Sequence, residues 1–65
     1  MYEIVGDVKG LYRNGKEFIE VILRISRKAT NYRLKMWNDT FNKEFLFKDS
    51  FDLFDYIHKN FILYL

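Results

Sequence analysis

Positive charge and aromatic rings meet in the first half of this 65-residue chain. From Lys9 to Lys35 eight basic residues stand against two acidic ones, a net charge of +6, whereas residues 36–65 hold three basic and five acidic residues, a net charge of −2. Residues 32–37 read Tyr-Arg-Leu-Lys-Met-Trp, so cations alternate with apolar side chains and Trp37 ends the run. Cations that meet phosphates, beside a ring on which a base can stack, are typical of surfaces that bind single-stranded nucleic acid.

Few residues of this chain could act as a catalyst or a metal ligand. His58 is the single histidine and there is no cysteine, whereas general-base and nucleophilic catalysis both need a positioned partner group. Asp49, Asp52 and Asp55 are spaced so that a helix brings them together, but acidic residues in a first turn ordinarily complement the helix dipole. The glycines precede no predicted helix, which argues against a Gly-rich phosphate loop. We therefore predict no enzyme activity, no metal site and no cofactor.

The basic residues fall on predicted β-strands that would gather them on one surface. Asn-Gly at positions 14 and 15 lies between two alternating runs and predicts a type I′ hairpin turn, because that turn needs positive φ at both central residues. This turn pairs Arg13 with Lys16 and Asp7 with Ile22. Side chains alternate between the two faces of a strand. One face of the hairpin is therefore apolar, and the other carries charged residues such as Lys9.

Two further strands follow, each after a short polar turn. The first turn places Arg24 opposite Lys35, and the second places Arg33 opposite Lys48. Like charges directly opposite one another destabilise a sheet, and an anionic partner would relieve that repulsion. The predicted nucleic-acid-binding residues are Arg24, Arg33, Lys35, Trp37, Lys48, Lys9 and Phe18. Two alternatives stay open, a solvated polar face with its cations extended into water, and a face that binds an acidic protein.

Asp49 or Ser50 begins a predicted helix that ends at about residue 62. An apolar stripe on this helix would cover the apolar face of the sheet. The stripe consists of Phe51, Phe54, Ile57, His58 and Phe61. We predict an α+β fold for a single domain of residues 1–65, a four-stranded antiparallel β-meander followed by one C-terminal helix packed on one face (β-β-β-β-α).

The chain ends in five consecutive large apolar residues. A domain of this length buries a limited core, and without cysteine it has neither a disulfide nor a structural zinc site to stabilise it. Oligomerisation is the remaining common means. We therefore predict a homodimer that uses part of the helix and the C-terminal residues Phe61, Ile62, Leu63, Tyr64 and Leu65.

Residues 32–37 and the segment Glu44-Phe-Leu-Phe-Lys-Asp-Ser-Phe-Asp-Leu-Phe54 resemble the Positive Cofactor Four family of single-stranded-DNA-binding coactivators. The likeness covers roughly residues 16–62. The resemblance implies a curved four-stranded sheet followed by one helix, dimerisation through the helices, and binding of unpaired DNA by basic and aromatic residues of the sheet. Lys43-Glu44 stands where the family usually carries Lys-Gly before its last strand.

Two classes of function are consistent with the sequence. The basic cluster favours a non-enzymatic, sequence-tolerant, single-stranded nucleic-acid-binding dimer. The alternative is a small phage- or plasmid-type interaction or inhibitor protein that binds a host protein through its sheet face or edge. The formal net charge of only +2 favours this alternative. No run of roughly 18 apolar residues and no basic-then-apolar leader is present, so we predict a cytoplasmic protein that does not enter a membrane.

Overall fold

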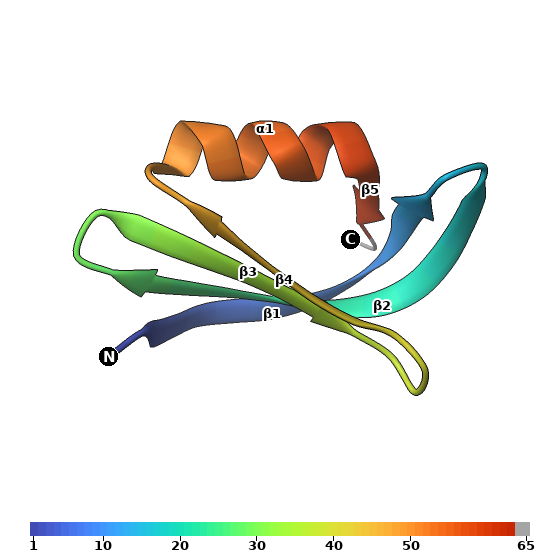
Figure 1. Ribbon diagram of the computed structural model, residues 1–65, viewed down its shortest axis with the longest axis horizontal. Helices are drawn as coiled ribbons and strands as arrows, with labels where there is room; N and C mark the ends of the chain where they lie inside the picture. The colour runs from blue at the N-terminus through green and yellow to red at the C-terminus, as the bar shows by residue number, and fades with distance from the viewer. Residues whose placement is uncertain (64–65) are drawn as a thin grey trace.

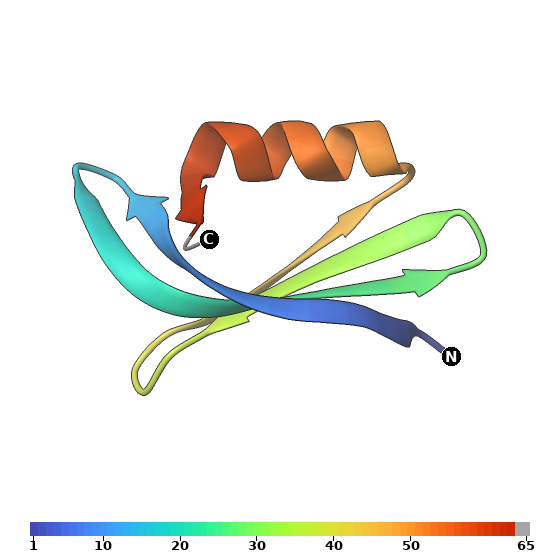
Figure 2. The same ribbon diagram turned by 180° about the vertical axis from the view of Figure 1, so that it is seen from behind.

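The computed structural model describes residues 1–63, which form one twisted antiparallel sheet and one helix. The elements are β1 (Glu3–Asn14), β2 (Glu17–Lys28), β3 (Asn31–Trp37), β4 (Asn42–Phe47), α1 (Ser50–Asn60) and β5 (Phe61–Leu63). The strands lie in the order β4-β3-β2-β1-β5. Figure 1 shows α1 lying across one face of the sheet, and the view from behind in Figure 2 shows β5 beside the hairpin end of β1. The predicted antiparallel sheet with a helix on one face is confirmed, but the described residues form five strands instead of four.

The turn between β1 and β2 lies one residue later than the sequence predicted. Asn14 pairs with Glu17, so Gly15 and Lys16 form the two-residue turn, and Gly15 has a φ of 69°. A glycine with positive φ at the first central position suits a type II′ turn, which matches strand twist as well as type I′ does. The predicted partners are therefore wrong by two residues, whereas the predicted faces are right from Gly6 to Asn14 because a shift of two preserves them.

The β2–β3 register is confirmed. Ile25 pairs with Leu34 and Leu23 pairs with Met36, as predicted from the apolar pattern. At the connecting turn each strand extends one residue further than expected, because Lys28 pairs with Asn31. The turn therefore has two residues, Ala29 and Thr30, instead of the four that were predicted. The φ of Ala29 is 53°. A two-residue turn was not expected here because residues with a Cβ are uncommon at positive φ.

The predicted β3–β4 register differs from the observed one by two residues. Trp37 pairs with Asn42 because Asn38 belongs to the loop and not to the ladder. The backbone N–H of Asn38 donates to the carbonyl oxygen of Phe41 at 2.9 Å, and its side-chain Oδ1 accepts from the backbone N–H of Thr40 at 2.9 Å. A loop closed by these two hydrogen bonds begins one residue earlier than the predicted turn.

The core lies between α1 and the face of the sheet that α1 covers. Its fully or nearly buried residues are Tyr12, Val21, Leu23, Leu34, Met36, Leu53, Ile57 and Phe61. Aromatic rings fill the end of this core near β5, where the ring centroid of Tyr12 lies 4.9 Å from that of Phe61. The hydroxyl oxygens of Tyr12 and Tyr56 are 3.2 Å apart, so the polar tips of both rings have a partner. Burial, together with this hydrogen bond, raises the pKa of Tyr56.

Helix α1 begins where predicted, and Ile57 and Phe61 of the predicted stripe are buried, but the other three members are exposed. Asp49 is the N-cap, and its Oδ1 accepts a hydrogen bond from the backbone N–H of Asp52 at 2.9 Å. The buried positions include Leu53 and Ile57, whereas Phe51 is 84 % and Phe54 58 % exposed. His58, the fourth member of the predicted stripe, is also exposed.

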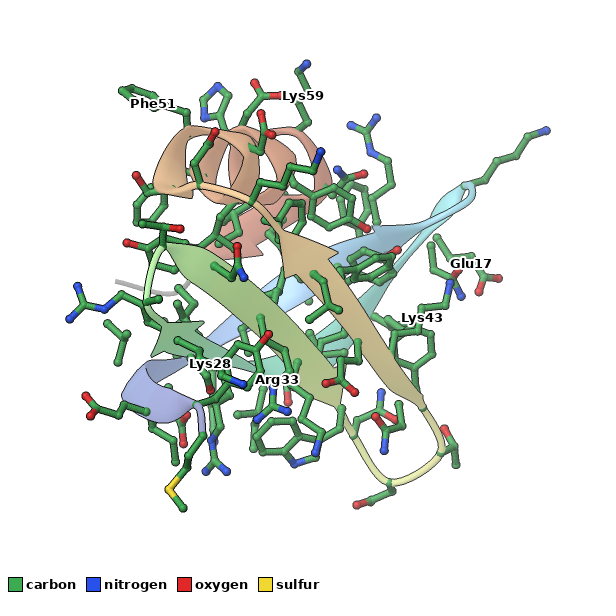
Figure 3. The ribbon with its side chains drawn as sticks, turned by 60° about the vertical axis from the view of Figure 1, so that its left-hand side comes forward. Glu17, Lys28, Arg33, Lys43, Phe51 and Lys59 are labelled. Atoms are coloured by element: carbon green, nitrogen blue, oxygen red, sulfur yellow. The ribbon has the colours of Figure 1, made fainter. Side chains whose placement is uncertain are left out.

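The helical repeat explains this error. Six positions correspond to 600° at 3.6 residues per turn, so Phe51 lies about 120° away from Ile57 around the helix and cannot share its face. Leu53, Ile57 and Phe61 recur every four residues and face the sheet instead. Figure 3 shows Phe51 on the side of α1 that points away from the sheet.

The helix also ends earlier than predicted, because the chain turns at Phe61 into β5. This short strand pairs antiparallel with β1 through Leu63 with Gly10 and Phe61 with Tyr12. A Cβ at position 10 would lie 2.9 Å from the carbonyl oxygen of Ile62, so the missing side chain of Gly10 permits the close approach of β5.

Within residues 1–63 no helix is long and apolar enough to cross a bilayer.

Candidate nucleic-acid interface

The face of the sheet opposite α1 carries most of the residues that the sequence singled out. We call it the outer face. Strand alternation and the observed registers place residues of four strands on it. They are Tyr2, Ile4, Asp7, Lys9, Leu11 and Arg13 from β1 and the residue before it, Phe18, Glu20, Ile22, Arg24, Ser26 and Lys28 from β2, Asn31, Arg33, Lys35 and Trp37 from β3, and Asn42, Glu44 and Leu46 from β4. Figure 3 shows Arg33 on the sheet, far from Lys59 on α1.

A row of four charged residues crosses the middle of the outer face. Asp7 pairs with Arg24, Arg24 with Lys35, and Lys35 with Glu44. The like-charged pair of Arg24 and Lys35 is therefore present as predicted, but a carboxylate flanks it on each side. In the predicted register Asp7 lay opposite Ile22, which hid this arrangement.

Arg24 is held by two hydrogen bonds to a single carboxylate. Its Nε donates to Oδ1 of Asp7 and its Nη2 donates to Oδ2, each at 2.9 Å. These hydrogen bonds hold the pKa of Asp7 below its usual value, so the pair stays charged at neutral pH. Such bidentate contacts fix the plane of the guanidinium group. The carboxylate compensates the charge of Arg24, so the repulsion from Lys35 does not by itself demand an external anion.

The second predicted like-charged pair is absent. Leu46, not Lys48, lies opposite Arg33. The Nε atom of Arg33 lies 3.3 Å from Oε1 of Glu44, and its guanidinium carbon lies 4.4 Å from the centre of the Tyr2 ring. Arg33 is therefore partly neutralised and stacked on an aromatic ring. The prediction failed because it rested on the β3–β4 register that Asn38 displaces.

Trp37 lies at the edge of an open pocket of about 480 Å³. The guanidinium carbon of Arg24 lies 5.2 Å from the centre of its ring. Lys9, Ile22 and Trp37 are consecutive in the next row of the outer face. The pocket is lined by Lys9, Glu20, Val21, Ile22, Trp37, Asn38, Asp39 and Thr40. A flat ring could enter here beside the indole, with the Lys9 ammonium close by.

The remaining predicted binding residues lie towards the two ends of the outer face. Phe18 is close to half exposed, and the guanidinium carbon of Arg13, its partner on β1, lies 5.8 Å from the ring centre. Lys48 follows β4 and lines a second pocket of about 380 Å³. The other residues of that pocket are Tyr2, Asn31, Leu46 and Phe47. Trp37 with Arg24 and Lys9 thus forms the centre, and Phe18 and Lys48 are peripheral.

The five residues predicted to form a dimer interface have different surroundings. Phe61 is 8 % exposed and belongs to the core of the single chain, so it has little surface to offer a second copy. Ile62 and Leu63 are exposed on β5. Tyr64 and Leu65 lie outside the described residues.

Sequence reasoning missed Tyr2 as part of this surface, and it missed the ion pairs that Asp7 forms with Arg24 and that Glu44 forms with Arg33. The register of β1 shifts between Ile4 and Gly6, a bulge that inserts one residue and reverses the alternation of side chains before it. This reversal brings Tyr2 onto the outer face, and no feature of the apolar pattern signals it. The partner of Asp7 could have been predicted from the sequence. Opposite charges favour cross-strand pairing, and only a turn at Gly15 and Lys16 places Asp7 opposite Arg24.

The outer face thus combines stacked aromatic rings, cations and an open pocket. No group of three His, Cys, Asp or Glu side chains within residues 1–63 is arranged to hold a metal ion.

The resemblance to the Positive Cofactor Four family stays a prediction. No family model matches the chain, and neither the curated proteins nor the solved structures include a match to it.

Proposed function

We propose that this protein is a non-enzymatic, sequence-tolerant binder of single-stranded nucleic acid, and that the strand lies across the outer face. The observation that carries the proposal is the half-buried Trp37 ring, which has the Arg24 guanidinium on one side and an open pocket beside it. Unpaired bases stack on aromatic rings and on arginine planes, and such stacking tolerates any base.

The excess of cations on the outer face supports this function, but the acidic residues beside them limit the affinity for nucleic acid. The strands of this face contribute six cations, Lys9, Arg13, Arg24, Lys28, Arg33 and Lys35, against the three acids Asp7, Glu20 and Glu44. A phosphate must compete with Asp7 for Arg24 and with Glu44 for Arg33. We therefore expect few net phosphate contacts and correspondingly modest, salt-sensitive binding.

Fluorescence of Trp37 tests the proposal directly, because the chain contains no other tryptophan. Oligo-dT added at about 50 mM salt should quench it, since this low ionic strength favours phosphate contacts. Trp37→Leu keeps apolar packing but removes the stacking platform, and should weaken binding by roughly 1–3 kcal/mol, as measured by anisotropy of a labelled oligonucleotide.

His58→Leu is the matched control, because it removes an exposed ring of α1 that belongs neither to the outer face nor to the proposed dimer contact. Its affinity should equal that of the wild type. Absence of both quenching and an anisotropy change in the wild type, with oligo-dT and with an oligomer of mixed base sequence, would show that the outer face does not bind nucleic acid.

We also propose that the protein acts as a homodimer. Ile62 and Leu63 on β5, and Phe51 and Phe54 on α1, leave apolar side chains in contact with water, and burying them between two copies would be favourable. Sedimentation at tens of micromolar distinguishes a dimer from an 8.0 kDa monomer. Phe54→Lys should abolish the dimer without disturbing the core, whereas a wild type that sediments as a monomer contradicts this proposal.

A protein partner is the second candidate, and one observation favours it. Strand β4 is an edge of the sheet, and its Leu46 side chain is 69 % exposed. Unpaired strand edges accept an extended segment of another protein by β-augmentation. In this case the protein would be a small interaction or inhibitor protein, and oligo-dT would leave Trp37 fluorescence unchanged.

A further inference from the structure

The pocket beside Trp37 has an acidic side that stacking on the indole does not explain. Glu20 and Asp39 both line it, and Lys9 is the single cation in the lining. A pocket that served only phosphate would be weakened by two carboxylates, since like charges repel. A base that enters this pocket therefore meets hydrogen-bond acceptors as well as a ring.

The Asn38 side chain fixes the loop that carries Asp39. Its Nδ2 donates to the backbone oxygen of Glu20 at 3.0 Å, which ties the loop to β2. Its Oδ1 accepts from the backbone N–H of Thr40 at 2.9 Å, so both neighbours of Asp39 are anchored. No ion pair within residues 1–63 engages the Asp39 carboxylate, which is exposed at the pocket. This carboxylate is thus positioned to accept hydrogen bonds from a ligand.

We propose that the Trp37 pocket selects bases that bear an amino group, guanine above the others, and that Asp39 is the residue that selects. The inference rests on the proposed binding of single strands, and it adds a preference of moderate size at one position to binding that otherwise tolerates any base. Guanine presents two adjacent donors, N1–H and the N2 amino group, and a carboxylate can accept both at once. Adenine and cytosine offer one amino group each. Thymine and uracil place carbonyl oxygens on both sides of their one N–H, and these oxygens are repelled by a carboxylate.

A series of dT oligomers that differ only at the central base tests this inference. The wild type should bind the oligomer with a central guanine about five- to tenfold more tightly than uninterrupted dT. This factor is at the lower end of the range for a bidentate base contact, because the pocket is open to water. RNA oligomers with guanine or uracil at the centre should show the same order. Asp39→Ala should abolish the difference while binding to uninterrupted dT stays equal or improves.

Glu17→Ala is the matched control for the change in net charge. Glu17 is exposed near the hairpin turn and does not line the pocket, so this variant should retain the guanine preference. Equal affinity of the wild type for all four central bases would overturn the inference and leave the proposed function intact. A preference that survives Asp39→Ala would also overturn it. Failure of every oligomer to bind would overturn both proposals.

Discussion

Removing the Asp7 carboxylate provides a sharp test of whether the outer face binds anions. Asp7 holds Arg24 by two hydrogen bonds of 2.9 Å, directly beside the Trp37 ring. Asp7→Asn keeps the shape of the side chain but removes its charge, so Arg24 becomes available to a phosphate. If the outer face is the binding site, this substitution in an acidic residue should strengthen nucleic-acid binding.

The size of the effect follows from the single cation that Asp7 engages. One phosphate contact contributes about 0.7 to the slope of log affinity against log salt for a single strand. At about 0.1 M salt, one freed contact should therefore raise the affinity roughly fivefold. Between about 50 and 200 mM salt, the affinity of the Asp7→Asn variant should fall about 2.6-fold more than that of the wild type.

Asp55→Asn supplies the matched control for this experiment. The carboxylate of Asp55 lies 3.0 Å from the Nζ atom of Lys59, and both residues belong to α1. This variant has the same net charge as Asp7→Asn and also frees one cation, but away from the outer face. Anisotropy titrations with labelled oligo-dT should detect little change for it. Equal gains for the two variants would indicate a response to net charge alone, and a loss of affinity in Asp7→Asn would refute the site.

Three further predictions concern stability. Because Arg24 lowers the pKa of folded Asp7, the stability that the pair contributes should be complete above about pH 4 and decline at lower pH, so wild type and Asp7→Asn should converge in urea titrations at acid pH. Gly10→Ala, whose Cβ would meet the Ile62 backbone oxygen, should cost about 1–2 kcal/mol in urea unfolding, whereas Gly6→Ala, with nothing within 4 Å, should gain up to about 1 kcal/mol; the reverse order would contradict the close approach of β5. Asp49→Ala removes the N-cap and should lower the stability measured by thermal unfolding by about 1 kcal/mol, an effect that Asp49→Asn should largely avoid.

The two faces of the sheet were predictable although two of the three meander registers were not. Side chains alternate with a period of two, and each register error was a shift of two residues. Trp37 and Arg24 therefore fall on the predicted face whichever register holds. The β2–β3 register was predictable as well, because Leu23 and Leu34 both needed apolar partners on one face.

The cross-strand partners were not predictable from apolar periodicity, because polar side chains decide them. Asn38 closes the β3–β4 loop with its side chain and so leaves the ladder. Gly15 takes the first position of its turn instead of the second. Each choice shifts the partner strand by two residues. In the β3–β4 ladder this shift places Leu46 instead of Lys48 opposite Arg33 and brings Oε1 of Glu44 to 3.3 Å from the Arg33 Nε atom.

The predictions for the helix and the C-terminus failed for another reason. The predicted stripe consisted of Phe51, Phe54, Ile57, His58 and Phe61, and the prediction therefore placed Phe51 and Phe54 in the core. The 3.6-residue repeat of a helix instead aligns Leu53, Ile57 and Phe61, at intervals of four, on the buried side. The return of the chain as β5 depends on the absent side chain of Gly10, a tertiary contact that local sequence does not encode.

The acidic residues of the outer face have a role that a count of charges obscures. Asp7 fixes the guanidinium plane of Arg24 near Trp37, and Glu44 approaches Arg33 while Tyr2 stacks on it. A long cation that is already ordered loses less side-chain entropy on binding, so each carboxylate lowers the electrostatic attraction and also prepares the arginine for a planar ligand. This compensation favours ligands that offer rings as well as phosphates over ligands that offer charge alone. It is also why a net charge of +2 is compatible with a surface that binds single strands.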